Sequence, residues 1–226
     1  MVNNYKKWKK SSYSAEKIMV GSWVTHYIKI DKHGQTFYKD GRKITFDIRH
    51  PSKIDWDSQL SLVNNTLLKL TPHQIDIAKY WGTGVPTKQF LPIMDQLIDT
   101  YKVPAPMAAH ILAVVLAAIN DTFVLTWKLK FDWLVARPNQ LDQSLVTILS
   151  TPRHPTYPSG HATVGGCSEV VLGYFFPGEA KKLRKMFQEC ADSRLYAGVH
   201  FPIDNEEGLR LGRQVGQIVV EELSKA

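Results

Sequence analysis

The sequence predicts a mainly α-helical bundle with a small β element near its N-terminus. Two observations carry this prediction. After Pro51, apolar residues recur at helical spacing between prolines and polar residues of the kind that start helices. Before that position, short stretches alternate apolar and polar residues between glycines and aspartates, as hairpins do. With 226 residues, the chain is long enough for one domain with a substantial core.

The first fifty residues are predicted to form an arm followed by the β element. Residues 1–22 are polar and basic, and the lysine cluster at 6–10 is typical of a solvated arm. Alternation in residues 27–30 and 44–48, with Asp and Gly between the two stretches, predicts a β-hairpin or an irregular meander. We therefore divide the chain into 1–50, an arm with a β-hairpin, and 51–226, a helical domain.

The helical domain opens with four predicted helices that begin at caps or prolines. Asp55 and Thr71 are candidate N-caps, and a proline occupies the first helical position behind Thr71. Prolines also precede the next two stretches with helical periodicity. In chain order, the helices are expected to run from Asp55 to Leu70, from Thr71 to Tyr80, from Pro86 through Ile98, and from Pro106 to about Trp127.

Four further helices are expected in the second half of the chain. In order, they cover residues 141–149, 160–174, 177–196 and a last stretch that ends near Leu223, with Asp204 as a candidate N-cap. The helix at 160–174 is rich in small residues, and the helix at 177–196 opens at a Pro-Gly-Glu sequence.

Charge and composition favour a soluble protein that meets anions. The formal net charge of +7 favours anionic partners without naming one. Cys167 and Cys190 are too few for a disulfide framework and are predicted to be small buried residues. No secretory signal peptide is expected, because the N-terminus is basic and lacks an apolar core. The most apolar stretch, 103–127, contains Asn120 and Asp121, which predicts a buried helix and no transmembrane segment; we expect a cytoplasmic or otherwise soluble protein.

Three short motifs carry the chemistry, and the first is Lys130-x6-Arg137-Pro138. Two helical turns would place both cations on one face if the helix continued to the arginine. Stacked in this way, they would clamp the oxygens of an oxyanion. The alternative is a pair of solvated basic residues, which is the commoner fate of a Lys/Arg pair.

The second motif, Pro158-Ser159-Gly160-His161, marks a helix start. Ser159 is a candidate N-cap, and Gly160 lets the backbone approach a ligand closely. Helix N-termini bind phosphate-like anions through free N–H groups and the helix dipole. His161 then lies in the first turn, where it can exchange a proton with the anion. The alternative is an ordinary cap followed by a surface histidine.

The third motif is Ser193-Arg194-x5-His200-x3-Asp204. Arg194 supplies a third cation, and His200 is a candidate nucleophile toward phosphorus or ligand to vanadium. Pro202 predicts a turn at His200, with Asp204 at the next helix start, where its carboxylate can fix the tautomer of the histidine. The alternatives are a core histidine and a plain N-cap.

Together the three motifs resemble the signature of the superfamily of type 2 phosphatidic acid phosphatases and vanadium-dependent haloperoxidases. The resemblance covers roughly residues 75–220 and implies the helical bundle of that superfamily. It implies that a lysine, two arginines and a Ser-Gly pair bind the oxyanion, that one histidine is the acid–base group, and that a second histidine, oriented by an aspartate, is the nucleophile or vanadium ligand. By position these roles fall on Lys130, Arg137, Arg194, Ser159 and Gly160, then on His161, His200 and Asp204.

Neighbouring residues favour the haloperoxidase branch. Trp127 lies three residues before the motif lysine, and Phe201 follows the second motif histidine, as in haloperoxidases. His154 lies seven residues before the first motif histidine, where bromoperoxidase-like members carry a second histidine. Residues 77–81 resemble that branch as well. The resemblance therefore implies a haloperoxidase that favours bromide, with Trp127, His154 and Phe201 near the halide.

Under this expectation the cofactor is vanadate bound by His200, and the substrates are hydrogen peroxide and a halide. The resemblance implies that His161 deprotonates the peroxide and that Lys130 activates it. The alternative is a soluble, metal-independent acid phosphatase that needs no cofactor and hydrolyses phosphate esters through a phosphohistidine intermediate. Such phosphatases are closer in size to this chain, whereas haloperoxidases are usually longer.

A binding protein for nucleic acid or anionic lipid is a third possibility, based on charge alone. The sequence contains no basic patch interleaved with aromatic residues and no recognised nucleic-acid motif, so we expect no nucleic-acid partner. Related proteins often pair, and a homodimer is therefore a further expectation.

Overall fold

The structure is a computed structural model that describes residues 4–9, 18–31 and 33–225. This part of the chain holds eight α-helices and three short strands, which confirms the predicted mainly α fold with a small β element. In chain order the elements are η1 (Ile18–Ser22), β1 (Ile28–Ile30), β2 (Thr36–Tyr38), β3 (Lys43–Ile44), η2 (Pro51–Lys53), α1 (Trp56–Leu67), α2 (Pro72–Gly82), α3 (Pro86–Thr100), α4 (Ala105–Trp133), α5 (Pro138–Leu141), α6 (Gly160–Phe175), η3 (Pro177–Glu179), α7 (Ala180–Tyr196) and α8 (Pro202–Leu223).

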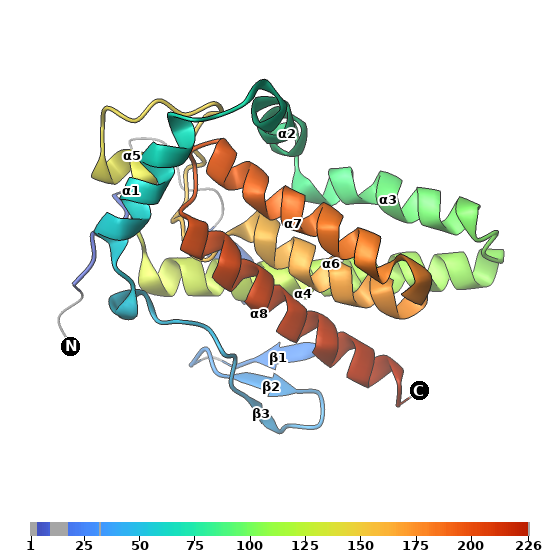
Figure 1. Ribbon diagram of the computed structural model, residues 1–226. Helices are drawn as coiled ribbons and strands as arrows, with labels where there is room; N and C mark the ends of the chain where they lie inside the picture. Colours follow the sequence, from blue (N-terminus) through green and yellow to red (C-terminus); the bar gives the residue numbers. More distant parts are fainter. Residues whose placement is uncertain (1–3, 10–17, 32, 226) are drawn as a thin grey trace.

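Helix α6 runs through the middle of the bundle. It packs against α7 and α8 on one side and against α4 on the other (Figure 1). The main core lies between these helices, α2 and α3, and its largest fully buried side chains include those of Trp81, Phe90, Phe187, Met94 and Ile119. A second apolar cluster surrounds Trp56 at the end of the bundle where α1 lies.

Helices α6 and α8 approach each other closely along a seam of glycines. A Cβ atom added to Gly212 would lie 2.0 Å from the carbonyl oxygen of Thr163, and one added to Gly166 would lie 2.4 Å from a backbone oxygen of α8. Only glycine fits at this separation. The seam aligns the N-terminal ends of the two helices, where the backbone N–H of Ser159 donates to the carbonyl of Asp204 at 3.0 Å.

We predict that Gly212→Ala destabilises the protein by about 3 kcal/mol, because the added methyl group meets backbone atoms that cannot move aside. Gly173→Ala is the matched control on α6: its Cβ would meet only Ala180, at an ordinary 3.6 Å. Alanine there is expected to be neutral or to stabilise the helix by about 0.5–1 kcal/mol. Urea unfolding of both variants checks the prediction, and equal stabilities would show that the seam can open without cost.

The three strands form an antiparallel sheet in the order β1-β2-β3. Ile28 pairs with Tyr38 and Thr36 pairs with Ile44, and the two isoleucines join the main core. The expected hairpin is therefore a three-stranded meander, in which the second alternating stretch contributes only its first residue, Ile44.

A buried carboxylate fixes the start of this sheet to the bundle. Asp121, in the middle of the apolar helix α4, accepts hydrogen bonds from the backbone N–H groups of His26, Tyr27 and Ile28 at 2.6–3.2 Å. Burial of a carboxylate is costly unless it is hydrogen-bonded, so these three donors explain why the helix tolerates it.

The N-terminal arm is docked on the bundle where the structure describes it, while Lys6 and Lys9 stay exposed as expected. Residues 4–9 lie against the segment that follows α4, because Trp8 N–H donates to Leu134 O at 2.6 Å and Ala136 N–H donates to Lys6 O at 3.1 Å. Tyr5 is buried, and Lys7 donates to Trp133 O at 2.8 Å. The rest of the predicted arm, residues 1–3 and 10–17, lies outside the described residues. The division into 1–50 and 51–226 stays a prediction.

Three local predictions were wrong. Helix α4 continues to Trp133 and ends at Leu134 in the left-handed conformation (φ 53°), so no single helix joins Lys130 to Arg137. Residues 142–149 are not helical, because the side chain of Asp142 accepts from Ser144 N–H and closes a turn after α5. Asp204 is not the N-cap of α8, since the helix begins at Pro202 and places Asp204 in its first turn.

Helix α4 is the one helix in the described part of the chain that is long and apolar enough to cross a membrane by length and composition. Half of the most apolar stretch of this helix is buried inside the bundle. The core helix of a soluble protein can have the same length and composition, so this property alone does not place the protein in a membrane.

Candidate active site

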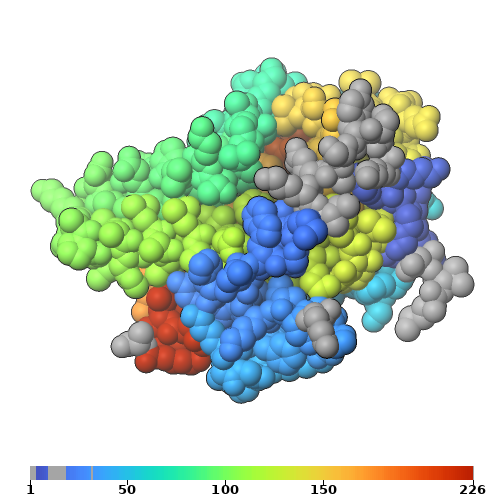
Figure 2. Space-filling model, turned by 180° about the vertical axis from the view of Figure 1, so that it is seen from behind, coloured from blue at the N-terminus to red at the C-terminus, as the bar shows by residue number. Residues whose placement is uncertain are grey.

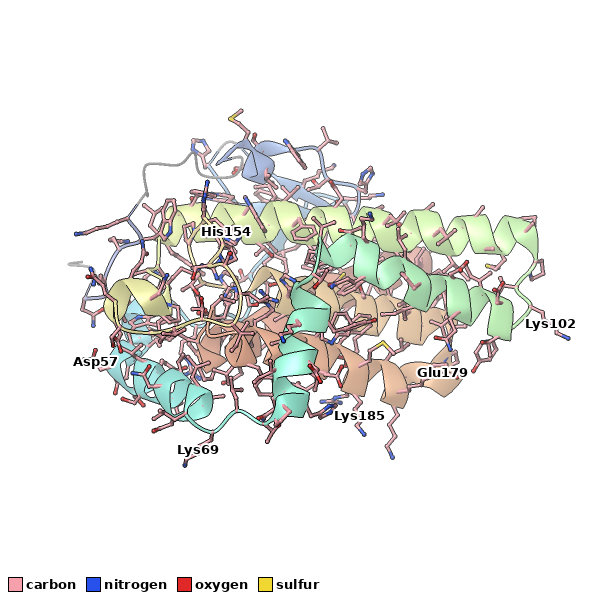
Figure 3. The ribbon with its side chains drawn as sticks, turned by 90° about the horizontal axis from the view of Figure 1, so that it is seen from above. Asp57, Lys69, Lys102, His154, Glu179 and Lys185 are labelled. Atoms are coloured by element: carbon pink, nitrogen blue, oxygen red, sulfur yellow. The ribbon has the colours of Figure 1, made fainter. Side chains whose placement is uncertain are left out.

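The three sequence motifs meet at one end of the bundle. His154 lies there, on the loop that leads from α5 to α6, whereas Lys102 and Glu179 mark the opposite end (Figure 3). Lys130 comes from the last turns of α4, Arg137 precedes α5, and Arg194 comes from the last turn of α7. The site therefore collects side chains from segments that are far apart in the sequence.

Lys130 and Arg137 are fully buried and held by backbone carbonyls. The ammonium group of Lys130 donates to Pro155 O at 2.8 Å and to Thr156 O at 2.6 Å. Arg137 donates from Nε to His154 O at 3.0 Å and from Nη1 to Val199 O at 2.6 Å. Burial lowers the pKa of Arg137 to about 9, which still leaves it charged at neutral pH. Neutral carbonyls orient these cations without cancelling their charge.

Arg194 is a buried cation that lacks partners for part of its guanidinium group. Its side chain is 3% exposed, and neither Nε nor Nη1 has a hydrogen-bond partner among the described residues. Burial lowers its pKa to about 10, so it too is charged at neutral pH. Buried donors are nearly always satisfied, and these two N–H groups therefore indicate a site for an anion.

Hydrogen bonding fixes the tautomer of His200. Its Nε2 lies 3.1 Å from Arg137 Nη1, and a guanidinium group can only donate, so Nε2 carries a lone pair. The proton then lies on Nδ1, 2.8 Å from Asp204 Oδ2. Burial, with the nearby Arg137 and Lys130 charges, lowers the pKa of His200 well below its usual range. His200 thus presents a neutral ring with its unprotonated nitrogen toward a cation.

Asp204 organises this corner of the site. Besides His200, its Oδ2 accepts hydrogen bonds from the backbone N–H of Phe201 at 3.0 Å and from the hydroxyl of Thr156. Burial raises the pKa of Asp204 to about 6, partly offset by the Thr156 hydrogen bond and Lys130. Thr156 is a site residue that the sequence did not reveal, although it stands two residues before the Pro158-Ser159-Gly160-His161 motif.

His161 lies at the N-terminal end of α6, where free backbone N–H groups point outward. Ser159 caps this helix with its hydroxyl 3.5 Å from Ala162 N. The Nε2 atom of His161 lies 3.2 Å from the carbonyl oxygen of Trp81, which can only accept, so the proton is on Nε2 and Nδ1 is free to take one. Burial, followed by Arg194, lowers the pKa of His161 well below its usual range. The ring is a base held in one orientation.

Trp127 and His154 form a second wall beside the cations. Their rings lie 4.9 Å apart, and the ammonium group of Lys130 lies 5.9 Å from the Trp127 ring centre. His154 Nδ1 lies 3.1 Å from both Arg137 Nη2 and the carbonyl oxygen of Pro155, so these contacts hold the ring in place beside the cations. A Cβ atom on Gly160 would lie 3.4 Å from the Trp127 ring.

Phe201 is the one predicted site residue whose side chain the structure places elsewhere. Its ring packs 5.2 Å from that of Trp56 in the second apolar cluster and is fully buried. Only the backbone N–H of Phe201 serves the site, through Asp204. The halide contact expected for its ring is not supported.

The pH dependence of stability follows from the buried rings of His154, His161 and His200. Burial lowers the pKa of all three, so the unfolded chain binds more protons below about pH 6.5, and stability that is complete above that pH is lost as the pH falls. Asp204 acts in the opposite sense, because its raised pKa favours the folded state at low pH. Since three histidines oppose one carboxyl group, we expect stability to fall with a net slope as the pH drops from about 6 toward about 4.

Urea unfolding of the anion-free protein at a series of pH values measures this slope. His154→Phe should flatten it by about one proton, whereas His110→Phe, at an exposed position on α4, should leave it unchanged. A stability that stays level from pH 7 to pH 4 would contradict the assignment of neutral, buried histidines.

Fold and site together define a helical protein with a buried cationic site whose donors suit an oxyanion. Three cations, a helix N-terminus and two neutral histidines converge there, and no group of three or more His, Cys, Asp or Glu side chains within the described ranges is placed to hold a metal ion directly. Phosphate-like anions satisfy such a donor set.

Comparisons with known proteins agree with this class. Residues 176–226 match the family model of the VCPO second helical-bundle domain. A bacterial vanadium-dependent iodoperoxidase is similar with a TM-score of 0.74 and 20% identity, covering 95% of this chain and 59% of that chain. An apo-type bacterial vanadium-dependent chloroperoxidase is similar with a TM-score of 0.76 and 13% identity, covering 100% and 64%. No curated protein matches the sequence.

A phosphatase shares the fold as well. A transmembrane PAP2-type phosphatidylglycerolphosphate phosphatase from Bacillus subtilis is similar with a TM-score of 0.59 and 19% identity, covering 75% of this chain and 86% of that chain. The chain spans less than two thirds of the length of the two haloperoxidases. Its fold is the one shared by the vanadium haloperoxidases and the PAP2-type phosphatases.

Proposed function

We propose that the protein is a vanadium-dependent haloperoxidase that oxidises halide, preferably bromide, with hydrogen peroxide. The observation that carries this proposal over phosphate hydrolysis is the Trp127–His154 wall beside the three cations. The indole Nε1 of Trp127 is buried without a partner in the described part of the chain, and the His154 ring, held by Arg137 and Pro155, can present an N–H group beside it. Two N–H donors and a nearby ammonium group suit a large, polarisable anion better than the organic part of an ester.

The residues of the pocket fit vanadate. Arg194 has two buried N–H groups without partners, and the lone pair of His200 Nε2 is directed toward the cations. We infer that Lys130, Arg137, Arg194, Ser159 and Gly160 would hold the vanadate oxygens and that His200 Nε2 would bind vanadium. When bound, vanadate supplies the Lewis acidity that makes peroxide electrophilic toward halide.

The protein's own groups handle charge and protons. His161 accepts a proton from hydrogen peroxide on Nδ1 while Trp81 O holds its other nitrogen. Asp204 keeps the proton of His200 on Nδ1 and so preserves the lone pair on Nε2. Lys130, held on two carbonyls, would supply positive charge beside the peroxide. The net reaction consumes one peroxide, one halide and one proton, and yields hypohalous acid and water.

Phosphate monoester hydrolysis through a phosphohistidine is the second candidate. The unprotonated Nε2 of His200 suits attack on phosphorus, and His161 suits protonation of the leaving alkoxide. The same cations would stabilise the transition state, and no cofactor would be needed.

One protein preparation assayed in two ways distinguishes the candidates. The first assay adds vanadate, bromide and hydrogen peroxide and follows bromination of an acceptor. The second omits vanadate and follows hydrolysis of an aryl phosphate. We expect vanadate to activate the first reaction and to inhibit any hydrolysis in the second. If bromide oxidation does not appear at saturating vanadate, the haloperoxidase assignment is wrong.

His154→Phe should lower bromide oxidation by about tenfold or more and affect aryl phosphate hydrolysis much less. The phenyl ring keeps the contact with Trp127 but removes the N–H donor and the acceptor for Arg137. The expected size is that of a lost hydrogen bond to a charged group, about 1.5–3 kcal/mol. His50→Phe is the control, because His50 stacks on Trp133 outside the cationic pocket. Equal losses in both assays would make His154 a structural residue only.

We further propose that the protein works in a soluble compartment, since α4 is half buried in the bundle where it is most apolar. A homodimer is part of the same proposal, and sedimentation at two protein concentrations tests it. A protein that sediments as a monomer at both would remove this part of the proposal.

A further inference from the structure

A large open cavity lies beside the candidate active site, between the N-terminal segment and the C-terminal half of α4. Its volume is about 830 Å³, within the range of small-molecule sites. Figure 2 shows the blue N-terminal segment lying across the green to yellow part of α4. The apolar lining residues are Met19, Trp23, Val24, Trp127 and Phe131.

The polar side chains that line this cavity already have partners within the chain. Lys128 pairs with Asp132 at 2.6 Å, and Lys29 donates to Lys39 O at 2.8 Å. Asp31 accepts from two backbone N–H groups at 2.8 and 2.9 Å. A charged group on a ligand would therefore add little to its affinity for this cavity. The surface that remains for a ligand to contact is apolar and aromatic.

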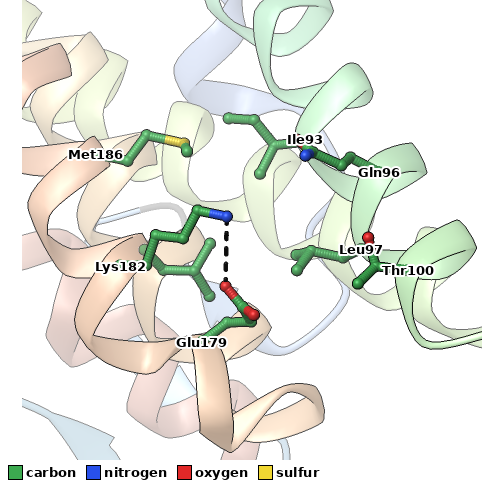
Figure 4. Close-up of a pocket in the computed structure, with 8 residues that line it drawn as sticks. Ile93, Gln96, Leu97, Thr100, Glu179, Lys182 and Met186 are labelled. Atoms are coloured by element: carbon green, nitrogen blue, oxygen red, sulfur yellow. Dashed lines mark ion pairs between the residues drawn. The ribbon is translucent and has the colours of Figure 1, made fainter.

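The rim of the cavity exposes large apolar side chains. Met19 is 69% exposed, Trp23 48% and Val24 82%, all within six residues of one another. Such a patch on a small protein commonly marks a binding site. By contrast, the cavity between α3 and α7, where Lys182 pairs with Glu179 at 3.6 Å, has a volume of only about 30 Å³ (Figure 4). It has room for a water molecule and not for an organic ligand.

Trp127 connects the large cavity with the oxyanion site. It lines the cavity, its ring lies 4.9 Å from that of His154, and a Cβ atom added to Gly160 would lie 3.4 Å from the indole. A ring bound against the indole would lie one side chain away from the groups that handle the oxyanion.

We propose that this cavity binds the organic substrate as a neutral aromatic compound, the acceptor that receives the halogen. This inference rests on the proposed function and adds a binding site to it. The aromatic ring packs between Trp23 and the Trp127–Phe131 face of α4. Halogenation is then selective for acceptors that fit the cavity, instead of following only the reactivity of free hypohalous acid.

The test uses 2-naphthol, which is a halogen acceptor and whose phosphate ester is a phosphatase substrate. Calorimetric titration without peroxide, halide or vanadate measures binding alone. We expect saturable binding that is unchanged by inorganic phosphate, because phosphate would occupy the oxyanion pocket. Trp23→Ala should weaken it by about fivefold, the effect of losing one aromatic contact. Tyr174→Ala, similarly exposed at 44% but outside the cavity, should not change it.

A second variant guards against misfolding of the first. Met19→Ser/Val24→Ser leaves the tryptophan in place and should weaken binding as well, with the circular dichroism spectrum unchanged. Three results would each overturn the inference: no saturable binding to the native protein, an affinity in both cavity variants equal to that of the native protein, or competition by phosphate.

Turnover separates this inference from the proposed function. A mixture of 2-naphthol and phenol should be brominated in a ratio that differs from that given by reagent hypobromous acid. Trp23→Ala should shift this ratio toward that of the reagent. If 2-naphthol binds in the cavity but only 2-naphthyl phosphate is turned over, the proposed function fails and the aromatic site stands. If bromination occurs in the reagent's ratio for every variant, the site fails and the proposed function stands.

Discussion

Replacing His200 with alanine is expected to abolish turnover, with a loss of about 10⁴-fold or more in either assay. The lone pair of His200 Nε2, which is directed toward Arg137, is the group that would attack phosphorus or bind vanadium. Alanine removes this nitrogen and leaves neither a nucleophile nor a ligand. The variant should also lose tight vanadate binding, which equilibrium dialysis measures without turnover. Folding should survive, because Asp204 keeps the Thr156 and Phe201 hydrogen bonds.

His110→Ala is the matched control, since His110 lies exposed on α4 at a distance from the motifs. It should retain full activity and vanadate affinity. Turnover of His200→Ala above about one per cent of the native rate would remove His200 from the reaction and with it the whole assignment of the site.

Asp204→Asn should lower the turnover rate by about 10³–10⁴-fold while leaving the fold intact. The carboxylate accepts the Nδ1 proton of His200 at 2.8 Å, whereas an amide can donate to Nδ1 and move the ring proton to Nε2. A proton on Nε2 would face Arg137 and occupy the lone pair that the reaction needs. The loss should appear in the rate more than in the Michaelis constant for peroxide or ester.

Asp57→Asn, at an exposed position in the first turn of α1, is the control for the loss of one carboxylate. An Asp204→Asn enzyme that works within tenfold of the native rate would show that the His200 tautomer is set by other contacts, such as the one with Thr156 at 3.1 Å.

The helices were predictable where local chemistry sets their ends. Asp55 accepts from Ser58 N–H, and Thr71 forms a capping box with Gln74, so both caps function as expected. Cys167 and Cys190 are buried and free, as expected. The predicted end of a helix was wrong where the deciding contact was not local. Helix α4 was expected to end at about Trp127, but it extends to Trp133, whose carbonyl accepts hydrogen bonds from Lys7 and Tyr5 near the N-terminus.

The eight motif positions could be named from their chemistry, but the reason for their convergence could not be read from spacing. Arg137 reaches the site from an extended residue (ψ 158°) ahead of α5, and not from a continued helix. The groups that hold the motif residues are mostly backbone carbonyls, such as those of Pro155, Val199 and Trp81. Every residue type has a carbonyl, so no sequence pattern reveals which one will be used.

The pairing of residues 4–9 with residues 134–136 has a consequence for how the protein assembles. The two segments are separated by more than a hundred residues in the sequence, and the second of them lies between Lys130 and Arg137. Residues 4–9 leave the ribosome well before the segment that they pair with, and Arg194 and His200 are made later still. Because contacts this distant form slowly, recovery of oxyanion binding should lag behind recovery of helix content during refolding.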